Sequence, residues 1–291
     1  MAELSPMMKQ YFAIKEKHKN HILFFRLGDF YEMFFDDAIT ASRELELTLT
    51  GRDCGQEERA PMCGVPYHSS ESYVARLVKK GYKVAICEQV EDPAAAKGIV
   101  RREVVRVITP GTVLENSMLE EGSNNYICCV YQGQEGYGLA FADISTGEIH
   151  LTAIPQGENR DNQLKNELSR FFPNEIVFNA AFLDNKEMGR FIKERLSCTA
   201  DLLEEGFCDY DQAKKLVLRH FGKASLEELS LEEIPLGVCA LGGLLAYLYD
   251  TQRHGLDCLV NMNIYSDTQF MNLDLTEIGR ASCRERVLRL V

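Results

Sequence analysis

A phenylalanine and a glutamate stand two residues apart directly after a short apolar run, at Phe30 and Glu32. In an extended chain, side chains at positions i and i+2 point to the same side. Phe30 could therefore present a flat apolar surface, and Glu32 a hydrogen-bond acceptor, to one common target. The alternative is that Phe30 joins an aromatic core with its neighbours Phe24, Phe25, Phe34 and Phe35. Composition alone favours this second interpretation.

The elements that must position these two residues alternate between helix and strand. Ser5 and Pro6 are typical of a helix start, and the apolar run 22–27, ended by Gly28, predicts a strand. A helix is expected through Asp36 to about Glu44. A later helix begins at Ser69-Ser70 and ends at Gly81. Two further strands are expected at 83–89 and 103–108, so the first 110 residues predict a mixed α/β domain.

A second α/β domain is expected after a polar linker. Residues 114–125 are rich in Glu, Asn and Ser, which is typical of a linker. Four strands are then expected, at 126–131, 138–143, 148–154 and 175–178. A later helix carries Ala213, Leu216, Val217 and Phe221 on one face. The uncharged run 234–249 is shorter than the ~20 residues that span a bilayer, so it predicts a buried helix.

Composition narrows the classes of function. The net charge is −12, yet residues 1–110 hold 16 basic and 16 acidic side chains, so the whole deficit lies in the remainder, with 16 against 28. A nucleic-acid site would therefore lie in the first third and depend on local geometry more than on a positive field. The ten cysteines include no Cys-x-x-Cys pair, and no secretory signal is recognisable, which predicts reduced cysteines and a cytoplasmic protein.

Several ordered motifs resemble the bacterial MutS family of DNA mismatch repair proteins. The first is Gly28-Asp29-Phe30-Tyr31-Glu32-Met33-Phe34, followed by Asp36-Asp37-Ala38. The others follow in the family's order and at similar spacing: Pro61-Met62-Cys63-Gly64-Val65-Pro66-Tyr67-His68, Val84-Ala85-Ile86-Cys87-Glu88-Gln89, Asp92-Pro93 and Thr109-Pro110-Gly111-Thr112. The resemblance covers nearly the whole chain and is weaker through the second domain.

The resemblance implies a specific role for the first pair of residues. In the family, the aromatic at the Phe30 position enters the minor groove and stacks on a mispaired or unpaired base, while the carboxylate at the Glu32 position hydrogen-bonds to that base. The resemblance also implies further DNA contacts from a loop beside this aromatic, which acts as a wedge. The residues of this loop are Met62, Val65, Pro66, Tyr67 and His68. The alternative is that they form a rigid turn that binds no ligand. Arg76 and Lys79, like Arg52 and Lys80, are candidates for phosphate contacts by charge, although solvated surface charge is the alternative for each.

The same resemblance predicts the fold class and the domains. The expected fold is α/β, with a mixed-sheet mismatch-binding domain at 1–112 and a linker at 113–125. A ribonuclease-H-like connector domain follows at 126–255, and 256–275 would begin an all-helical lever domain. Residues 276–291 depart from the family and resemble a translated sequencing adapter, so we expect a non-native tail. The implied partners are mismatched duplex DNA, MutL and a second MutS subunit, with no membrane.

The sequence is compatible with two other classes of function. Asp143 and Glu148 on adjacent strands are compatible with a nuclease that binds two Mg²⁺ ions, but Ser145-Thr146-Gly147 predicts that both are solvated residues flanking a turn. The acidic second domain suits a protein-interaction fragment. No Gly-x-x-x-x-Gly-Lys-Ser/Thr motif occurs, so we expect no enzyme activity and no cofactor here, whereas the full-length family uses ATP and Mg.

Overall fold

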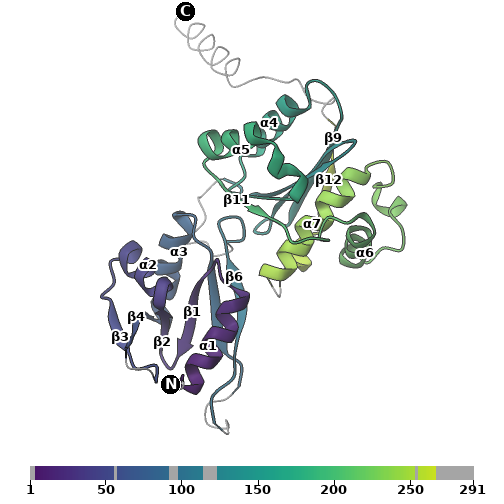
Figure 1. Cartoon of the computed structure of the whole chain (residues 1–291). Coiled ribbons are helices and arrows are strands. Elements are labelled where there is room, and N and C mark those ends of the chain that lie inside the picture. The colour runs from purple at the N-terminus through teal and green to yellow at the C-terminus, as the bar shows by residue number, and fades with distance from the viewer. Residues whose placement is uncertain (1–3, 56–57, 92–97, 114–122, 253–254, 267–291) are drawn as a thin grey trace, which may run out of the picture. The chain divides into compact units, whose positions relative to one another are not determined.

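The computed structural model describes residues 4–55, 58–91, 98–113, 123–252 and 255–266 (Figure 1). These residues form two compact units. Unit 1 comprises residues 1–125 and 247–258, and unit 2 comprises residues 126–246 and 259–291. Each unit is built around one mixed six-stranded sheet.

Unit 1 contains three α-helices and six strands among its described residues. The helices are α1 (Pro6–Lys17), α2 (Phe35–Leu45) and α3 (Ser70–Lys79), and two 3-10 helices are η1 (Tyr67–Ser69) and η5 (Leu256–Cys258). The strands are β1 (Ile22–Leu27), β2 (Phe30–Phe34), β3 (Thr50–Arg52), β4 (Ala60–Pro66), β5 (Val84–Gln89) and β6 (Arg102–Ile108). Their order in the sheet is β3-β4-β2-β1-β5-β6, and only β1 and β5 pair in parallel.

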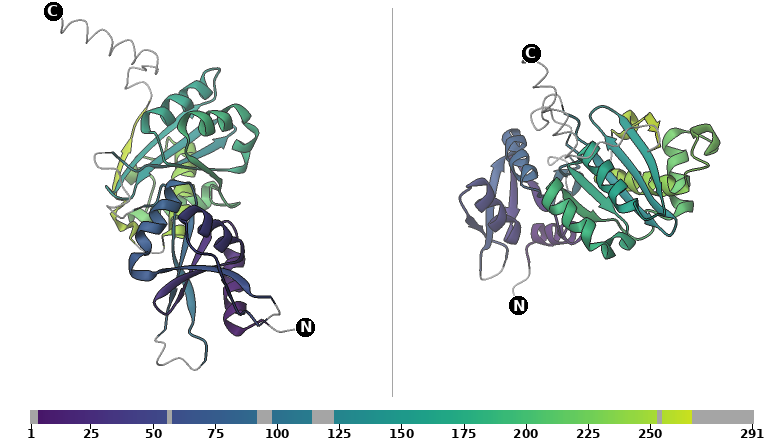
Figure 2. Two further views of the ribbon diagram at one scale, coloured as in Figure 1. Left: turned by 90° about the vertical axis from the view of Figure 1, so that its left-hand side faces the viewer. Right: turned by 90° about the horizontal axis from the view of Figure 1, so that it is seen from above.

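Helices cover both faces of the unit 1 sheet. Leu23 and Phe25 of β1 pack with the buried Met8 and Tyr11 of α1. Phe24, which points to the opposite face, belongs to the core formed with α2 and α3. Figure 2 shows α1 and α3 on either side of this sheet. The alternation of buried side chains along β1 therefore fixes a three-layer unit.

Two side chains form hydrogen bonds at the borders of unit 1, Ser5 at the start of α1 and Gln252 at the edge strand β6. The hydroxyl of Ser5 accepts the N–H of Met8 at 3.4 Å, as expected for the residue that caps α1. The side-chain amide of Gln252 donates to the carbonyl of Val107 on the edge strand β6 at 2.8 Å, and its oxygen accepts from Arg106 Nε at 2.8 Å. Residues from the far end of the sequence thus complete the edge of the first sheet.

Unit 2 also has a mixed sheet between helices. Its strands are β7 (Ile127–Gly133), β8 (Gly136–Asp143), β9 (Glu148–Pro155), β10 (Glu175–Phe178), β11 (Thr199–Leu202) and β12 (Asn261–Ile264). Its helices are α4 (Arg160–Phe171), α5 (Lys186–Phe191), α6 (Tyr210–Phe221) and α7 (Pro235–Thr251, with its last turn in unit 1), and the shorter helices are η2 (Ala180–Asp184), η3 (Ile192–Leu196) and η4 (Glu227–Leu229). The sheet order is β11-β10-β7-β8-β9-β12.

The two faces of the unit 2 sheet are covered differently. One face packs Cys128, Leu139 and Phe141 against Leu164 and Leu168 of α4. On the other face α7 approaches so closely that a Cβ on Gly138 would lie 1.9 Å from the carbonyl oxygen of Leu236. Figure 1 shows α4 and α5 on one face and α6 and α7 on the other. Close approach of a helix backbone to a strand is therefore the reason for glycine at position 138.

The fold-class prediction of mixed α/β structure is confirmed. Strands at 22–27 and 175–178 have the predicted bounds, and the apolar run near 234–249 forms the long helix α7. No strand was expected at β2, β3, β4, β11 or β12, although Phe30 and Glu32 were expected to lie in extended chain. Residues 261–264 form a strand paired in parallel with β9, within a range expected to begin an all-helical domain. Residues 267–291, including the suspected non-native tail, lie outside the described residues.

Most of the described cysteines lie in the interior of the two units. Nine cysteines fall among the described residues, all are free, and seven of them are buried. They pack as small apolar side chains. Within the described part of the chain, no helix combines the length and hydropathy required for crossing a bilayer.

Candidate nucleic-acid interface

A tight hairpin positions the sequence-predicted pair. β1 and β2 are antiparallel, and Leu27 pairs with Phe30, so only Gly28 and Asp29 form the loop. Gly28 has φ +57°, in the left-handed region that favours glycine. Arg26 Nε also donates to the carbonyl of Gly28 at 2.5 Å. A two-residue hairpin with glycine first holds the following strand in one fixed register.

Phe30 and Glu32 share one face of β2, as the sequence predicted. Tyr31 and Met33 alternate with them and lie in the core, at 6% and 0% exposed. The ring of Phe30 is 47% exposed, so it does not belong to the aromatic core that was the alternative. The Glu32 side chain is only 14% exposed and forms an ion pair with Arg52 of β3. The hairpin therefore presents an open aromatic beside a covered, charge-paired carboxylate.

The segment 62–68 is neither the loop nor the rigid turn that we expected. Its first part lies in β4, where Cys63 and Val65 alternate into the core, and Pro66 is the last strand residue. Val65 is 1% exposed, so its side chain lies in the core and only its backbone is left for the expected DNA contact. Met62 and Pro66 are half-buried. Pairing of β4 with both β2 and β3 overrides the turn tendency of its prolines and glycine.

Tyr67 and His68 follow in the 3-10 helix η1 beside the hairpin loop. The N–H of Tyr67 donates to the carbonyl of Asp29 at 2.9 Å. The guanidinium of Arg26 lies 3.7 Å from the centre of the Tyr67 ring, and Arg26 also pairs with Glu88 at 3.6 Å. The Tyr67 side chain is 44% exposed and His68 is exposed. The structure thus brings a second open aromatic to the same hairpin.

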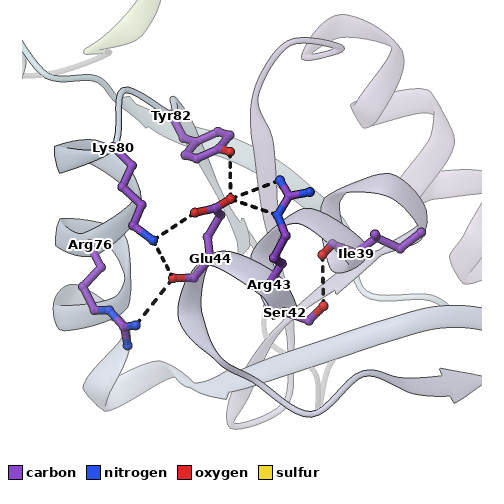
Figure 3. Close-up of polar contacts among 7 residues, drawn as sticks. All are labelled: Ile39, Ser42, Arg43, Glu44, Arg76, Lys80 and Tyr82. Carbon is purple, nitrogen blue, oxygen red and sulfur yellow. Dashed lines mark hydrogen bonds and ion pairs between the residues drawn. The ribbon is translucent and has the colours of Figure 1, made fainter.

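Arg76 and Lys79 lie farther along, on α3. Arg76 donates to the carbonyl of Leu45 at 3.3 Å, where α2 ends. It also donates to the carbonyl of Glu44 at 3.5 Å (Figure 3). Lys80 binds the carbonyl and the carboxylate of Glu44, at 3.0 and 2.9 Å. The Lys80 hydrogen bond, with Arg43 next, holds the pKa of Glu44 below its usual range. Arg76 and Lys80 therefore tie α3 to α2, whereas Lys79 is exposed.

Of the two carboxylates of the nuclease alternative, Glu148 is solvated as expected, with its side chain 47% exposed, and Asp143 is not. Asp143 is fully buried rather than solvated, because its carboxylate accepts the N–H of Ser145 at 2.9 Å and the hydroxyl of the same residue at 2.6 Å. Glu148 is opposite it in the β8–β9 register and lies 3.9 Å from His150. Among the described residues, no group of three or more metal-ligating side chains is positioned to hold an ion. Asp143 stabilises the turn at 144–147.

Sequence reasoning missed three residues of this region. Tyr31 donates its hydroxyl to Glu88, and burial, followed by the hydrogen bond to Glu88, raises the pKa of Tyr31. Arg26 was not singled out, although it contacts the Gly28 carbonyl, Glu88 and Tyr67. Glu88 falls within the quoted motif 84–89, which was the available signal. Its pairing with Tyr31 could not be foreseen because it depends on the sheet order.

Two family profiles match the chain. The profile described as MutS domain I matches residues 5–117, and that of MutS domain II matches residues 125–263. The chain is therefore of the class of two-domain α/β segments that MutS domains I and II define. It belongs to the MutS family, and comprises MutS domains I and II.

Curated relatives support the same assignment. The DNA mismatch repair proteins MutS of Acetivibrio thermocellus and Ruminiclostridium cellulolyticum are each 48% identical over 293 residues, which covers 98% of this chain and 33% of the relative. That of Clostridioides difficile is 45% identical over 275 residues, covering 94% of this chain and 28% of the relative. The chain thus spans about a third of the length of these relatives.

Proposed function

We propose that this chain recognises mispaired or unpaired bases in duplex DNA. Phe30 enters the minor groove and stacks on the faulty base, and Glu32 accepts a hydrogen bond from it. The observation that carries the proposal is the half-open Phe30 ring at the end of a fixed hairpin, with the Glu32 carboxylate on the same face. MutL and a second MutS subunit are the proposed partners, and the cytoplasm is the proposed location.

The physical basis of recognition is the ease with which a base step opens. Unstacking a step costs a few kcal/mol, and stacking on an aromatic returns ~1–3 kcal/mol per base. A mispaired step is already weakened, so it opens at a lower cost than a matched step. The deformation energy of the duplex then distinguishes an error in any sequence context.

A direct test compares the binding of this chain to a G·T duplex and to its matched control. We expect weak binding with a preference for the G·T duplex, measured by fluorescence anisotropy across a salt titration, because phosphate contacts make every affinity salt-dependent. The full-length MutS of Acetivibrio thermocellus serves as the positive control. Equal binding of both duplexes by this chain at every salt concentration, while the relative discriminates, would contradict the proposal.

Glu32→Gln is expected to increase binding to matched DNA. The substitution removes a negative charge and releases Arg52 from its ion pair, so an extra cation faces the phosphates. We expect affinity for the matched duplex to rise about tenfold, with a salt slope steeper by about 0.9. Glu16→Gln, which removes one exposed acid from α1, is the matched control. An unchanged salt slope for Glu32→Gln would be incompatible with this explanation.

Lys79 provides the cleanest test of the proposed phosphate contacts. Lys79→Ala is expected to weaken binding to matched and mismatched duplexes alike and to reduce the salt slope by about 1. Lys17→Ala, on the exposed side of α1, controls for net charge. Arg76 is less suitable, since removing its bonds to the end of α2 would also lower the free energy of unfolding by about 1 kcal/mol. If Lys79→Ala and Lys17→Ala have equal effects, Lys79 makes no specific contact.

A further inference from the structure

The Glu32 carboxylate is held by one identifiable cation. Its side chain is 14% exposed, and one of its oxygens accepts from Arg52 Nη1. A carboxylate removed from water to this extent is costly unless it is paired. Arg52, at 37% exposed, keeps contact with solvent while supplying the compensating charge.

The strand that lies between Arg52 and Glu32 has a glycine opposite Glu32. Arg52 lies on β3 and Glu32 on β2, and β4 runs between these strands. The β4 residue opposite Glu32 is Gly64, which has no side chain. A Cβ at that position would lie 3.3 Å from the carbonyl oxygen of Tyr31 and 3.5 Å from Glu32 Cγ. The strand between them therefore adds no side chain at the position directly opposite Glu32.

Two other arginines of this sheet, Arg102 and Arg26, form their hydrogen bonds and ion pairs with groups other than Glu32. Arg102 is 7% exposed and donates to the carbonyls of Arg26 and Val100 at 2.7 and 2.9 Å. Burial, with the nearby Arg52 contributing in the same direction, lowers the pKa of Arg102. Arg26 contacts Gly28, Glu88 and Tyr67 on the other face of the sheet. Neither of these two guanidinium groups makes the contact to Glu32 that Arg52 makes.

We propose that Arg52 is the positioning residue for Glu32. In the DNA-free protein it holds the carboxylate beside Phe30 and cancels its charge, so that the carboxylate can approach a polyanion. A base that offers a proton donor then binds a carboxylate already in place. This proposal rests on the proposed function, and it separates Arg52 from side chains that only contact phosphates.

The test is a double-mutant cycle in this chain with Arg52→Gln, Glu32→Gln and the double variant. With Glu32 present, Arg52→Gln is expected to lower the ratio of G·T to matched affinity by about five- to tenfold, which lies within the range for losing one typical hydrogen bond. In the Glu32→Gln background the same change is expected to alter the ratio less than about twofold. Arg52→Lys, which keeps the charge, is expected to recover most of the loss.

Equal effects of Arg52→Gln in both backgrounds, or no effect in either, would overturn the proposal in favour of an independent phosphate contact. A DNA-free measurement separates this failure from failure of the proposed function. In the ¹⁵N spectrum, Glu32→Gln is expected to shift the Arg52 Nε–H signal and to speed its exchange with solvent. If the parent chain binds both duplexes equally, the proposed function fails. The Arg52 proposal is then overturned only by an Nε–H signal that Glu32→Gln leaves unchanged.

Discussion

Replacing Phe30 with alanine is expected to abolish the preference for a mismatched duplex while leaving binding to matched DNA unchanged. Stacking on the aromatic is worth ~1–3 kcal/mol per base, so affinity for a G·T duplex should fall about 5-fold to 150-fold. Matched duplex is held mainly through phosphates, which Phe30 does not contact in this proposal. The ratio of the two affinities, measured by anisotropy at one stated salt concentration, should therefore approach one.

The same substitution should leave the fold intact. The Phe30 side chain is 47% exposed, so its loss should change the free energy of unfolding by less than about 1 kcal/mol. Phe12→Ala is the matched control, because Phe12 is a 39% exposed phenylalanine of the same unit, on α1. If Phe30→Ala kept the parent ratio, or if Phe12→Ala reduced it equally, the wedge assignment would be wrong.

A large loss of stability is expected from Gly138→Ala in unit 2. The added Cβ would lie 1.9 Å from the carbonyl oxygen of Leu236 and 3.1 Å from the nitrogen of Gly237, and neither backbone atom belongs to a flexible side chain. The helix α7 must move away from β8, which we expect to lower the free energy of unfolding by about 3 kcal/mol. Thermal unfolding followed by circular dichroism should show a midpoint lower by about 6–12 °C.

Gly157→Ala is the matched control for this change. A Cβ at Gly157 meets no atom within 4 Å, so the midpoint should stay within about 2 °C of the parent. Similar midpoints for the two variants would show that α7 does not pack on Gly138 as described.

The sequence predicted those strands and helices whose apolar pattern is complete within the element itself. The strands at 22–27 and 175–178 are short apolar runs with clear ends, and the helix α3 follows its apolar spacing. β4 was missed because two prolines and a glycine suggest a turn, although Cys63 and Val65 alternate into the core. β11 and β12 were missed because each pairs on one side only and alternates between half-buried and exposed residues.

In the candidate site too, some relations between residues could be predicted from the sequence and others could not. The i and i+2 relation of Phe30 and Glu32 could be predicted because it depends only on strand geometry. The partner of Glu32 could not, since Arg52 reaches it from another strand and no sequence spacing specifies that pair. Likewise, the burial of Val65 depends on its pairing with Tyr31 in the neighbouring strand.

The return of the chain to its first sheet has a practical consequence for domain dissection. Gln252 binds Val107 and Arg106, so a piece that stops at residue 125 would lose the group that occupies these positions on β6. An uncovered strand edge is a template for pairing with another chain. Recombinant expression of residues 1–125 by themselves therefore risks self-association, and a version without it would need the segment around Gln252 fused back through a short spacer.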